Sequence, residues 1–316
     1  MPSSILVTGG AGFIGHHLVR ALLDQERKVV VLDNFSSSDA SSLPDHPHLH
    51  LVEGDIRDTD TVDACLRQVD GVVHLAAMVS IQEAMENPSL AWDINVRASE
   101  YLLEAARQAG VKAFVFASSS AVYGDGGATP RRELDAVQPL SLYGAQKASI
   151  DALIQAYGHS FGMRAFALRF FNVFGPGQRA GGPYAALLAA YRELLRRGGP
   201  LTIFGDGTQS RDFVHVTDVV RGICLALNAD AERSGAYNIG TGRPRTVQHV
   251  AELVAGMGSD IELQYLPPRP AEILHSCADC SHARARLGYE AVVDFEAGLR
   301  QLMLEQPSTV QPKVSL

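Results

Sequence analysis

The sequence predicts an α/β protein built on a doubly wound parallel sheet. Short apolar runs at 5–8, 29–32, 71–77 and 113–117 alternate with segments whose apolar residues recur at helical spacing. Near-continuous apolar strands between amphipathic helices are typical of a parallel sheet covered by helices on both faces. Ligands of such sheets bind beyond the carboxyl ends of the strands, so we expect the functional site at that edge.

The remaining elements follow from the same periodicities. We expect helices over 89–109, 181–197, 217–227 and 247–255, and strands over 50–52, 201–204 and 237–240. Thr217 or Asp218 is the expected N-cap of the third of these helices. The segment 36–42 is polar and is expected to be a loop.

Length and composition exclude several classes of protein. The chain has 316 residues, 46% of them hydrophobic, with a formal net charge of −8, which corresponds to one large domain or two closely joined ones. Four cysteines are too few for a disulfide scaffold and fit a reducing compartment. The acidic balance argues against nucleic-acid or polybasic membrane binding, and no apolar run of about 18 residues could span a membrane. Because no basic leader precedes Ile5, we expect a cytoplasmic protein.

A glycine-rich turn follows the first strand. The run from Thr8 to Gly15 reads TGGAGFIG, a helix comes next, and the second strand stops at Asp33. Glycines let the backbone approach a pyrophosphate at a helix N-terminus, where free N–H groups and the helix dipole favour anions. A carboxylate at Asp33 can accept hydrogen bonds from both hydroxyls of an adenosine ribose and would repel a 2′-phosphate. The combination predicts NAD rather than NADP as cofactor; the glycines alone would indicate only a tight turn.

A second motif opens a later helix. Tyr143 and Lys147 lie four residues apart at the start of a segment expected to be helical to about His159, so they share a face. A free phenol has a pKa of about 10 and is a poor base at neutral pH. A neighbouring ammonium and a nicotinamide cation would lower that pKa. Such pairs also occur by chance on exposed helices, but the preceding run 118–120 is all serine and supplies a hydroxyl to hold a reacting oxygen.

Motifs in order along nearly the whole chain resemble the extended short-chain dehydrogenase/reductases, which include the NAD-dependent sugar-nucleotide epimerases and dehydratases. The matching segments are TGGAGFIG (8–15), Asp33, GDIRD (54–58), HLAA (74–77), SSSAVYG (118–124), YGAQK (143–147), RFFNVFGP (169–176), RDFVHVTDV (211–219) and RPAEILHSCAD (269–279). The resemblance implies a Rossmann-type NAD-binding domain over 1–171, with a returning segment at about 212–240. It also implies a smaller C-terminal α/β lobe over 172–316 that binds the nucleotide sugar. Within it, the Pro- and Ser-rich tail 307–316 is expected to be disordered.

The resemblance implies the site residues. The catalytic residues would be Tyr143, Lys147 and Ser119, which lies four residues before the tyrosine of the VYG element, with Ser118 and Ser120 as alternatives. The implied NAD-binding residues are Gly9, Gly12, Phe13, Ile14, Gly15, Asp33, Asn34, Asp55, Ile56, Leu75, Ala76, Ala77, Asn95, Tyr143, Lys147 and Phe170. The implied substrate-binding residues are Ser119, Ser120, Asn172, Arg211, Arg269, Glu272 and Ser276, with the two arginines suited to clamping a diphosphate.

Reactions of this family share a first step, in which the tyrosine takes the proton of a sugar hydroxyl while hydride passes to NAD. The 4-keto sugar then loses water, loses carbon dioxide or takes the hydride back on its other face. Similar dehydratases and decarboxylases carry an acid directly before the VYG element, where this chain has Ser120 and Ala121. The resemblance therefore implies 4-epimerisation. The alternatives are a nucleotide-sugar dehydratase or reductase and, less favoured because Ser119, Tyr143 and Lys147 are all present, a catalytically inactive dinucleotide sensor.

Ser276 bears on the choice of sugar. In similar 4-epimerases its position borders the C2 substituent, where a tyrosine restricts the site to glucose and galactose and a small residue admits an N-acetyl group. The resemblance therefore favours interconversion of UDP-N-acetylglucosamine (UDP-GlcNAc) and UDP-N-acetylgalactosamine (UDP-GalNAc), with UDP-glucose and UDP-galactose as the second pair. Relatives usually dimerise through helices near 90–109 and 144–160, which implies a homodimer.

Two clusters of potential metal ligands have simpler interpretations. His46, His48 and His50 alternate beside prolines, as in an exposed loop that leads into a strand. Cys277 and Cys280 form a C-x-x-C pair, but no second pair accompanies it and Cys277 lies inside the sugar-side motif. The sequence therefore predicts no metal site.

Overall fold

A computed structural model describes residues 1–125, 127–178, 187–258, 261–268 and 273–305. The expected tail 307–316 and the predicted site residues Arg269 and Glu272 lie outside these ranges. Of the expected helix over 181–197, the structure describes α7 (Leu187–Arg197). No helix in the described ranges is long and apolar enough to cross a membrane.

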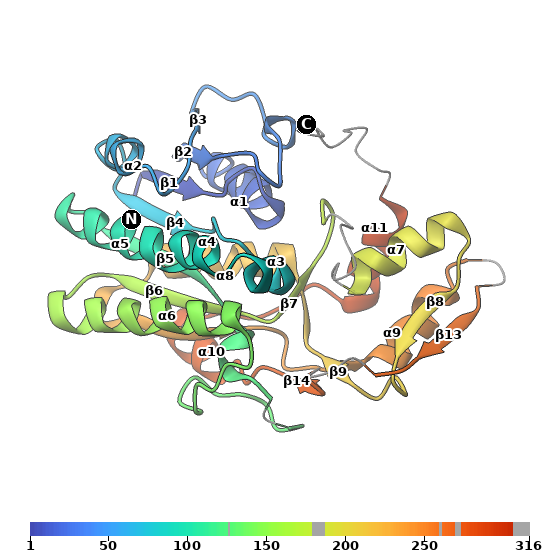
Figure 1. Ribbon diagram of the computed structural model, residues 1–316. Helices are drawn as coiled ribbons and strands as arrows, with labels where there is room; N and C mark the ends of the chain where they lie inside the picture. Colours follow the sequence, from blue (N-terminus) through green and yellow to red (C-terminus); the bar gives the residue numbers. More distant parts are fainter. Residues whose placement is uncertain (126, 179–186, 259–260, 269–272, 306–316) are drawn as a thin grey trace.

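A seven-stranded parallel sheet forms the centre of the molecule, as the sequence predicts (Figure 1). Its strands, in spatial order, are β11 (Gly235–Ile239), β6 (Ala165–Phe170), β5 (Ala113–Ser119), β4 (Gly71–His74), β1 (Ser4–Thr8), β2 (Lys28–Asp33) and β3 (Leu49–Glu53). The order reverses between β1 and β4, which pair with each other in parallel. This is the topological switch point at which doubly wound sheets bind ligands, and the glycine-rich turn follows β1 there.

Helices cover both faces of this sheet because its strands are apolar on both sides. On one face, α1 (Phe13–Leu23), α8 (Val216–Asn228) and α10 (Ser281–Leu287) pack into one apolar cluster. On the other face, α2 (Thr59–Leu66), α5 (Ala98–Gln108) and α6 (Leu142–Phe161) form a second cluster. Figure 1 shows α5 and α6 lying side by side across the sheet. The fold class is therefore the predicted Rossmann-type one.

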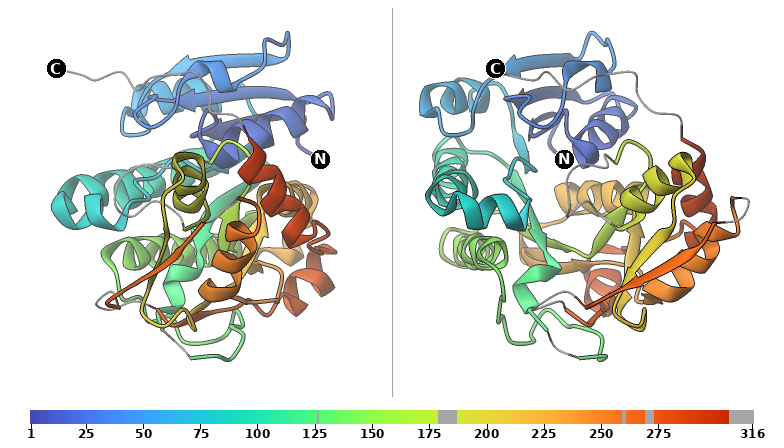
Figure 2. Two further views of the ribbon diagram at one scale, coloured as in Figure 1. Left: turned by 90° about the vertical axis from the view of Figure 1, so that its right-hand side faces the viewer. Right: turned by 45° about the vertical axis from the view of Figure 1, so that its right-hand side comes forward.

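The remaining elements form a smaller α/β part beside the sheet, seen from two further sides in Figure 2. Its helices are α7, α9 (Val247–Ala255) and α11 (Phe295–Leu304), which share an apolar core with β8 (Leu201–Phe204). The other strands are β7 (Asn172–Phe174), β9 (Ser210–Arg211), β10 (Phe213–His215), β12 (Arg245–Thr246), β13 (Leu263–Leu266) and β14 (His275–Ser276). They pair as β10–β7, β13–β8 and β12–β9–β14.

Three expectations about local structure are wrong in detail. The strand expected over 71–77 ends at His74, because its partner β1 ends at Thr8: the Leu75 N–H still reaches the Thr8 carbonyl, but the Ala76 N–H donates to the Thr8 hydroxyl instead. The helix expected over 89–109 consists of α4 (Pro88–Trp92), a π-helical turn (Asp93–Arg97) and α5. Its neighbour α3 (Ile81–Glu86) precedes it.

The third correction concerns the start of α8. The helix begins directly after β10, so its N-cap is His215, whose Nδ1 accepts from the Thr217 N–H, rather than Thr217 or Asp218. Asp218 is instead buried and accepts hydrogen bonds from the N–H groups of Val292 and Val293 at 3.0 and 3.1 Å. This carboxylate ties α8 to the segment that precedes α11.

Candidate active site

The glycine-rich turn after β1 has room for no side chain at two positions. Gly9 has φ +68°, and a Cβ there would lie 2.8 Å from the Ala76 nitrogen. A Cβ on Gly15 would lie 2.3 Å from the Gly9 carbonyl oxygen. Gly12 is the N-cap of α1 and offers no side chain to the amides of the first turn, where Phe13 and Ile14 lie. Close backbone approach and a helix N-terminus facing outward are the features that suit a pyrophosphate.

Asp33 lies at the end of β2 beside this turn. Its Oδ2 accepts from the Ala11 N–H at 3.0 Å, and its Oδ1 accepts from the Phe35 N–H at 2.9 Å and from the Ser38 hydroxyl at 3.0 Å. The side chain is buried. The carboxylate therefore fixes the geometry of the turn, a role that the sequence does not reveal. Its remaining lone pairs are left for a ligand.

Asn34 and Asp55 lie next to Asp33 at the edge of the predicted NAD site, and we call this pair the Asp55 rim. The Asn34 amide donates to Asp55 Oδ2 at 3.0 Å, and Arg57 pairs with the same carboxylate at 2.8 Å. The hydrogen bond from Arg57 lowers the pKa of Asp55 to about 2. Ile56 is buried below in the apolar cluster. The Asp55 carboxylate is therefore ionised at neutral pH and held by its neighbours.

Residues 75–77 are the next part of the predicted NAD site. A chain of hydrogen bonds, in which each donor and acceptor can be assigned, fixes their position. The Ser99 hydroxyl donates to the Asn95 carbonyl at 2.9 Å, so His74 Nε2 must donate to Ser99. His74 Nδ1 then accepts from the Thr8 hydroxyl at 2.7 Å, and the Thr8 oxygen accepts from the Ala76 N–H at 3.3 Å. Burial, with a smaller effect from the Lys147 charge, lowers the pKa of His74 to about 3, which keeps the imidazole neutral for this arrangement.

Asn95 lies in the π-helical turn and is completely buried. Its Oδ1 accepts from the Met78 N–H at 2.8 Å, and its Nδ2 donates to the Met78 carbonyl at 3.0 Å and to Gln146 Oε1 at 2.8 Å. It therefore connects the loop after β4 to α6. These hydrogen bonds support the segment around Leu75, Ala76 and Ala77.

Ser119, Tyr143 and Lys147 come together as the sequence predicts. Ser119 ends β5, pairs in register with Phe170 at the end of β6, and lies close enough to Tyr143 to lower the pKa of its phenol. Tyr143 lies in the first turn of α6, whose N-cap Ser141 accepts from the Gly144 N–H at 3.0 Å. Lys147 Nζ donates to the Ala117 carbonyl at 2.8 Å and lies 5.8 Å from the centroid of the Tyr143 ring.

The three consecutive serines have different surroundings. Ser118 is buried, and its hydroxyl is engaged by Asp151 Oδ2, to which it donates at 3.0 Å. Ser119 is partly exposed, and Ser120 begins the 3₁₀ turn Ser120–Tyr123. This geometry favours Ser119 as the serine that meets the phenol, and it leaves Ser120 next to it.

The expectation of a lowered pKa at Tyr143 includes the charge of a nicotinamide cation as well as that of Lys147, and the protein groups alone do not lower this pKa. Burial raises the pKa of Tyr143 to about 12, although its interaction with Ser119 opposes this rise. Burial also lowers the pKa of Lys147 to about 7. The ammonium is held by the Ala117 carbonyl and lies 4.6 Å from the centroid of the Phe116 ring. A further positive charge is therefore needed beside the phenol.

The predicted substrate-side residues in the described ranges gather on short strands. Ser276 on β14 pairs in register with Arg211 on β9, so the two side chains lie on neighbouring positions of one small sheet. Arg211 donates through Nη1 to the carbonyls of Ser210 and Leu274 at 2.9 and 3.3 Å. Asn172, on β7, donates its N–H to the carbonyl of Asp212, which follows Arg211.

Several supporting residues escape sequence reasoning, and Asp212 is the clearest. It is completely buried and accepts from the N–H groups of Thr241 and Gly242 at 2.9 Å and of Ala278 at 3.0 Å. It thereby ties the strand of Arg211 to the segment that follows Ser276. Its place beside Arg211 in the RDFVHVTDV motif is the one sequence feature that points to it. The sequence does not show which backbone groups it binds.

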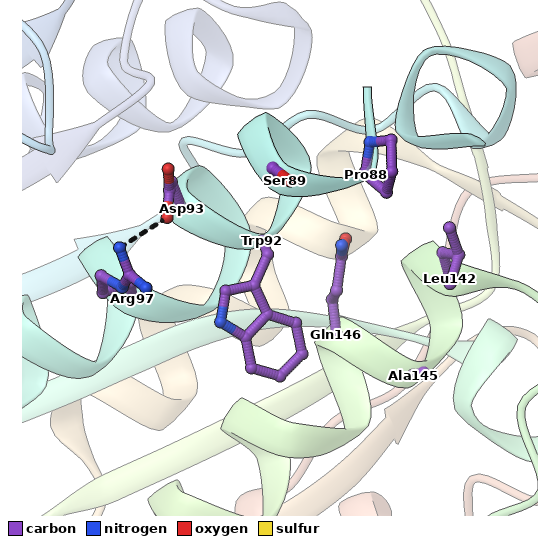
Figure 3. A pocket seen from close by; sticks show the side chains of 8 residues that line it. All are labelled: Pro88, Ser89, Trp92, Asp93, Arg97, Leu142, Ala145 and Gln146. Atoms are coloured by element: carbon purple, nitrogen blue, oxygen red, sulfur yellow. Dashed lines mark ion pairs between the residues drawn. The ribbon is translucent and has the colours of Figure 1, made fainter. Parts of the chain in front are cut away.

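A surface cavity of about 360 Å³ lies on the outer side of α6, between that helix and α4 (Figure 3). Trp92, Asp93 and Arg97 line one side of it, and Leu142 and Ala145 line the other. It is separate from the Ser119–Tyr143 pair, so it is not the predicted cofactor or substrate site. In the part of the chain that the structure describes, Cys277 and Cys280 are free thiols and no group of three or more His, Cys, Asp or Glu side chains is placed to hold a metal ion.

Comparison with known proteins agrees with this geometry. The model of the NAD-dependent epimerase/dehydratase family matches residues 5–240. The chain belongs to this family. A UDP-glucose 4-epimerase of Corynebacterium glutamicum is 33% identical to this protein, and the match covers 90% of each chain. A solved UDP-N-acetylglucosamine 4-epimerase from Methanobrevibacter ruminantium, in complex with UDP-N-acetylmuramic acid, is 36% identical with a TM-score of 0.90, covering 95% of this chain and 97% of that one.

This protein uses NAD, as its family does. A similar UDP-glucose 4-epimerase from Thermus thermophilus was solved in complex with NAD; it is 35% identical with a TM-score of 0.87, and the match covers 95% of this chain and 97% of that one. The turn of Gly9 and Gly15 fits this cofactor, because its backbone packs too tightly for side chains at these positions, as in the glycine-rich turns that bring backbone close to a pyrophosphate. Asp33, predicted to bind the adenosine ribose, ends β2 beside this turn.

Proposed function

We propose that this protein catalyses the NAD-dependent 4-epimerisation of a UDP-sugar through a transient 4-keto sugar. Its support is the combination of an assembled Ser119, Tyr143 and Lys147 with a 3₁₀ turn, Ser120–Tyr123, whose first two residues carry no carboxylate. A dehydratase or decarboxylase needs an acid there to move a proton at C5 or C6. The complete catalytic set also argues against a sensor.

Each catalytic side chain has one task in this proposal. Ser119 donates to the reacting sugar oxygen and holds it beside the phenol. Tyr143 takes the hydroxyl proton as the carbonyl forms and gives it back as the carbonyl is reduced. Lys147 is fixed by the Ala117 carbonyl and contributes positive charge below its pKa of about 7. Bound NAD supplies the hydride acceptor and donor and also a positive ring that favours the phenolate.

A panel experiment tests the proposed reaction. The protein is incubated separately with UDP-, dTDP- and GDP-sugars, and the products are identified by NMR. We expect a mixture of two sugars that differ only at C4, starting from a UDP-sugar. A product that has lost water or carbon dioxide would instead assign the dehydratase or decarboxylase alternative, and steady accumulation of NADH would assign a dehydrogenase.

UDP-GlcNAc and UDP-GalNAc are the favoured substrate pair within this proposal. Ser276 is small and lies in register beside Arg211, which is suited to the diphosphate. A hexose bound with its diphosphate near Arg211 would have space beside Ser276 for an N-acetyl group. A small residue permits the larger substrate without excluding UDP-glucose and UDP-galactose, so both pairs belong in the test.

Replacing Ser276 by tyrosine should change the ratio of the two activities. We expect Ser276→Tyr to lower kcat/KM for UDP-GlcNAc by about tenfold or more, with a change below about threefold for UDP-glucose, because a bulky ring in place of the hydroxymethyl group excludes the larger substituent. Ser281→Tyr, at the exposed start of α10, is the matched control. An equal effect of Ser276→Tyr on both sugars would remove this residue from the specificity argument.

We also propose that two copies associate through the outer faces of α4 and α6. Large apolar side chains are exposed on this side, including Trp92 at 46%, Leu142 at 45% and Met85 at 66%. Trp92 and Leu142 both line the surface cavity, with Gln146 between them (Figure 3). A partner helix would cover these side chains and fill that hollow.

A charge placed in this face should prevent dimer formation. We expect Trp92→Glu to shift the mass measured by light scattering from that of a dimer to that of a monomer, because burying an unpaired carboxylate opposes association. Val292→Glu, at a position 63% exposed beside α11, should leave the mass unchanged. A wild-type protein that is monomeric at all concentrations, or a Trp92→Glu variant that remains dimeric, would contradict the proposed interface.

A further inference from the structure

A buried polar network lies directly behind Ser119 and Tyr143. Its members are Ser118, Tyr123, Asp151, Arg169 and Asn238, none of which is more than 3% exposed. They come from β5, the following 3₁₀ turn, α6, β6 and β11 respectively. The network therefore joins every element that carries a catalytic residue.

Asp151 is the member of the network that lies on the same helix as Tyr143 and Lys147. It lies on α6, one helical turn beyond Lys147 and about two beyond Tyr143, so the three side chains occupy related positions along the helix. Its Oδ2 accepts from the Ser118 hydroxyl at 3.0 Å and from Arg169 Nε at 2.8 Å, and its Oδ1 accepts from Arg169 Nη2 at 3.3 Å. The α6 helix is thereby fastened to the strand end that presents Ser119.

Tyr123 extends the network toward the substrate side. Its hydroxyl accepts from Arg169 Nη1 at 2.8 Å and donates to Asn238 Oδ1 at 2.7 Å. Burial raises the pKa of Tyr123 to about 12, so the phenol keeps the proton that it donates. The Arg169 guanidinium also lies 4.9 Å from the centroid of the Tyr123 ring. Tyr123 is therefore held from its face and from its hydroxyl.

Asn238 completes the connection. Its Nδ2 donates to the Arg131 carbonyl at 2.7 Å and to the Asp279 carbonyl at 3.3 Å. Asp279 follows the strand of Ser276 by three residues, and its own N–H donates to the Arg131 carbonyl at 2.8 Å. One chain of contacts thus runs from the catalytic helix to the segment that carries the predicted sugar-side residue.

Such a network is a poor way to gain stability alone. Desolvating a carboxylate and a guanidinium offsets most of their attraction, so a buried ion pair adds little compared with apolar residues of similar volume. Fully satisfied polar networks do, however, define one geometry for the groups that they join. The Asp151–Ser118 bond joins α6 to the strand that bears Ser119, and the Tyr123–Asn238 bond leads on to the segment after Ser276.

We propose that Tyr123 is a positioning residue for catalysis, acting through Arg169 and Asp151 to hold the strand end that carries Ser119 against the helix that carries Tyr143. The inference rests on the proposed function for its kinetic consequence, but its structural consequence is independent of turnover. Loss of the Tyr123 hydroxyl loosens Arg169 and Asp151, and Ser119 is then held less firmly beside the phenol of Tyr143. Because the interaction with Ser119 favours the phenolate, the phenol of Tyr143 becomes harder to ionise.

The test replaces Tyr123 by phenylalanine and follows Tyr143 directly. Tyrosine labelled with ¹³C at Cζ reports the ionisation of Tyr143 by NMR in the NAD-bound protein, with the signal assigned by comparison with Tyr143→Phe. We expect Tyr123→Phe to shift the titration of Tyr143 upward by about one pH unit and to lower kcat about tenfold, with NAD content unchanged. The acid limb of the kcat profile should move upward by the same amount.

Two further variants separate positioning from stability. Tyr191→Phe removes another buried tyrosine hydroxyl, which donates to the Thr202 carbonyl in the smaller part of the molecule, and should leave the titration of Tyr143 and kcat unchanged. Ser118→Ala removes the link between Asp151 and β5 and should shift the titration in the same direction as Tyr123→Phe, by less. If Tyr123→Phe and Ser118→Ala lower the melting temperature but leave the Tyr143 titration at its wild-type position, the positioning role is overturned. Failure of the wild type to epimerise any UDP-sugar would reject the proposed function while leaving this titration result intact.

Discussion

Tyr143→Phe should lower kcat for the favoured UDP-sugar by about a thousandfold, because the variant has no group at this position to exchange a proton with the sugar hydroxyl. NAD content should stay near that of the wild type, since the glycine-rich turn, Asp33 and the Asp55 rim are unaffected. Turnover is measured by NMR, and bound NAD is measured by absorbance after the protein is unfolded.

The matched control for this variant lies on the same helix. Tyr157→Phe removes a hydroxyl that donates to Glu104 at 3.1 Å, away from the catalytic residues, and should retain wild-type turnover. Near-normal activity in Tyr143→Phe would refute its role as the base. A parallel loss of NAD from Tyr143→Phe would show that the lost activity reports cofactor binding rather than proton transfer.

Gly15→Ala should remove most of the bound NAD. The added Cβ would lie 2.3 Å from the Gly9 carbonyl oxygen and 2.7 Å from backbone atoms of Gly10, and backbone cannot move aside as a flexible side chain can. Overpacking of this kind costs about 1–3 kcal/mol in stability, and it would distort the turn that receives the pyrophosphate. We expect the NAD content to fall at least about tenfold, with activity falling in proportion.

Two other glycines provide a graded series. A Cβ on Gly12 would lie 3.2 Å from the Gly9 carbonyl, so Gly12→Ala should have an intermediate effect on NAD content. A Cβ on Gly199 would meet its nearest neighbour at 3.7 Å, an ordinary contact, so Gly199→Ala should bind NAD as the wild type does. Full NAD content in Gly15→Ala would mean that this turn does not form the pyrophosphate site.

The parts of the fold that the sequence predicts well are those whose signals are local. The strand, glycine-rich turn, helix and second strand from Ser4 to Asp33 each follow from a periodicity or from a residue type that permits one backbone geometry. The same is true of α9, which has the bounds expected from its apolar spacing. Register and strand order then follow from the doubly wound topology.

The site was predictable as a set of positions rather than as an arrangement. Ser119, Tyr143 and Lys147 are found together, and so are Arg211 and Ser276. Local sequence patterns do not show which group each buried polar side chain binds. Asp151 pairs with Arg169, and Asp212 binds Ala278, only because distant segments meet in the folded chain.

The direction of the pKa of Tyr143 illustrates the same limit. Helical spacing correctly places Lys147 on the face of Tyr143, but it does not show that the ammonium is held by the Ala117 carbonyl or that both groups are desolvated. Desolvation opposes the charged form of each group. The protein therefore positions the phenol beside Ser119, and in the proposed reaction the charge of bound NAD would favour its ionisation further.

The central claim is that one carbon of a UDP-sugar is oxidised and then reduced within a single binding event. Its most direct test uses UDP-GlcNAc and UDP-glucose, each carrying deuterium at C4 of the sugar, with products followed by NMR. We predict conversion of at least one of them to its C4 epimer with the deuterium kept at C4 and no net formation of NADH. Exchange of that deuterium with solvent, a product that has lost water, or no conversion of either sugar would contradict the claim.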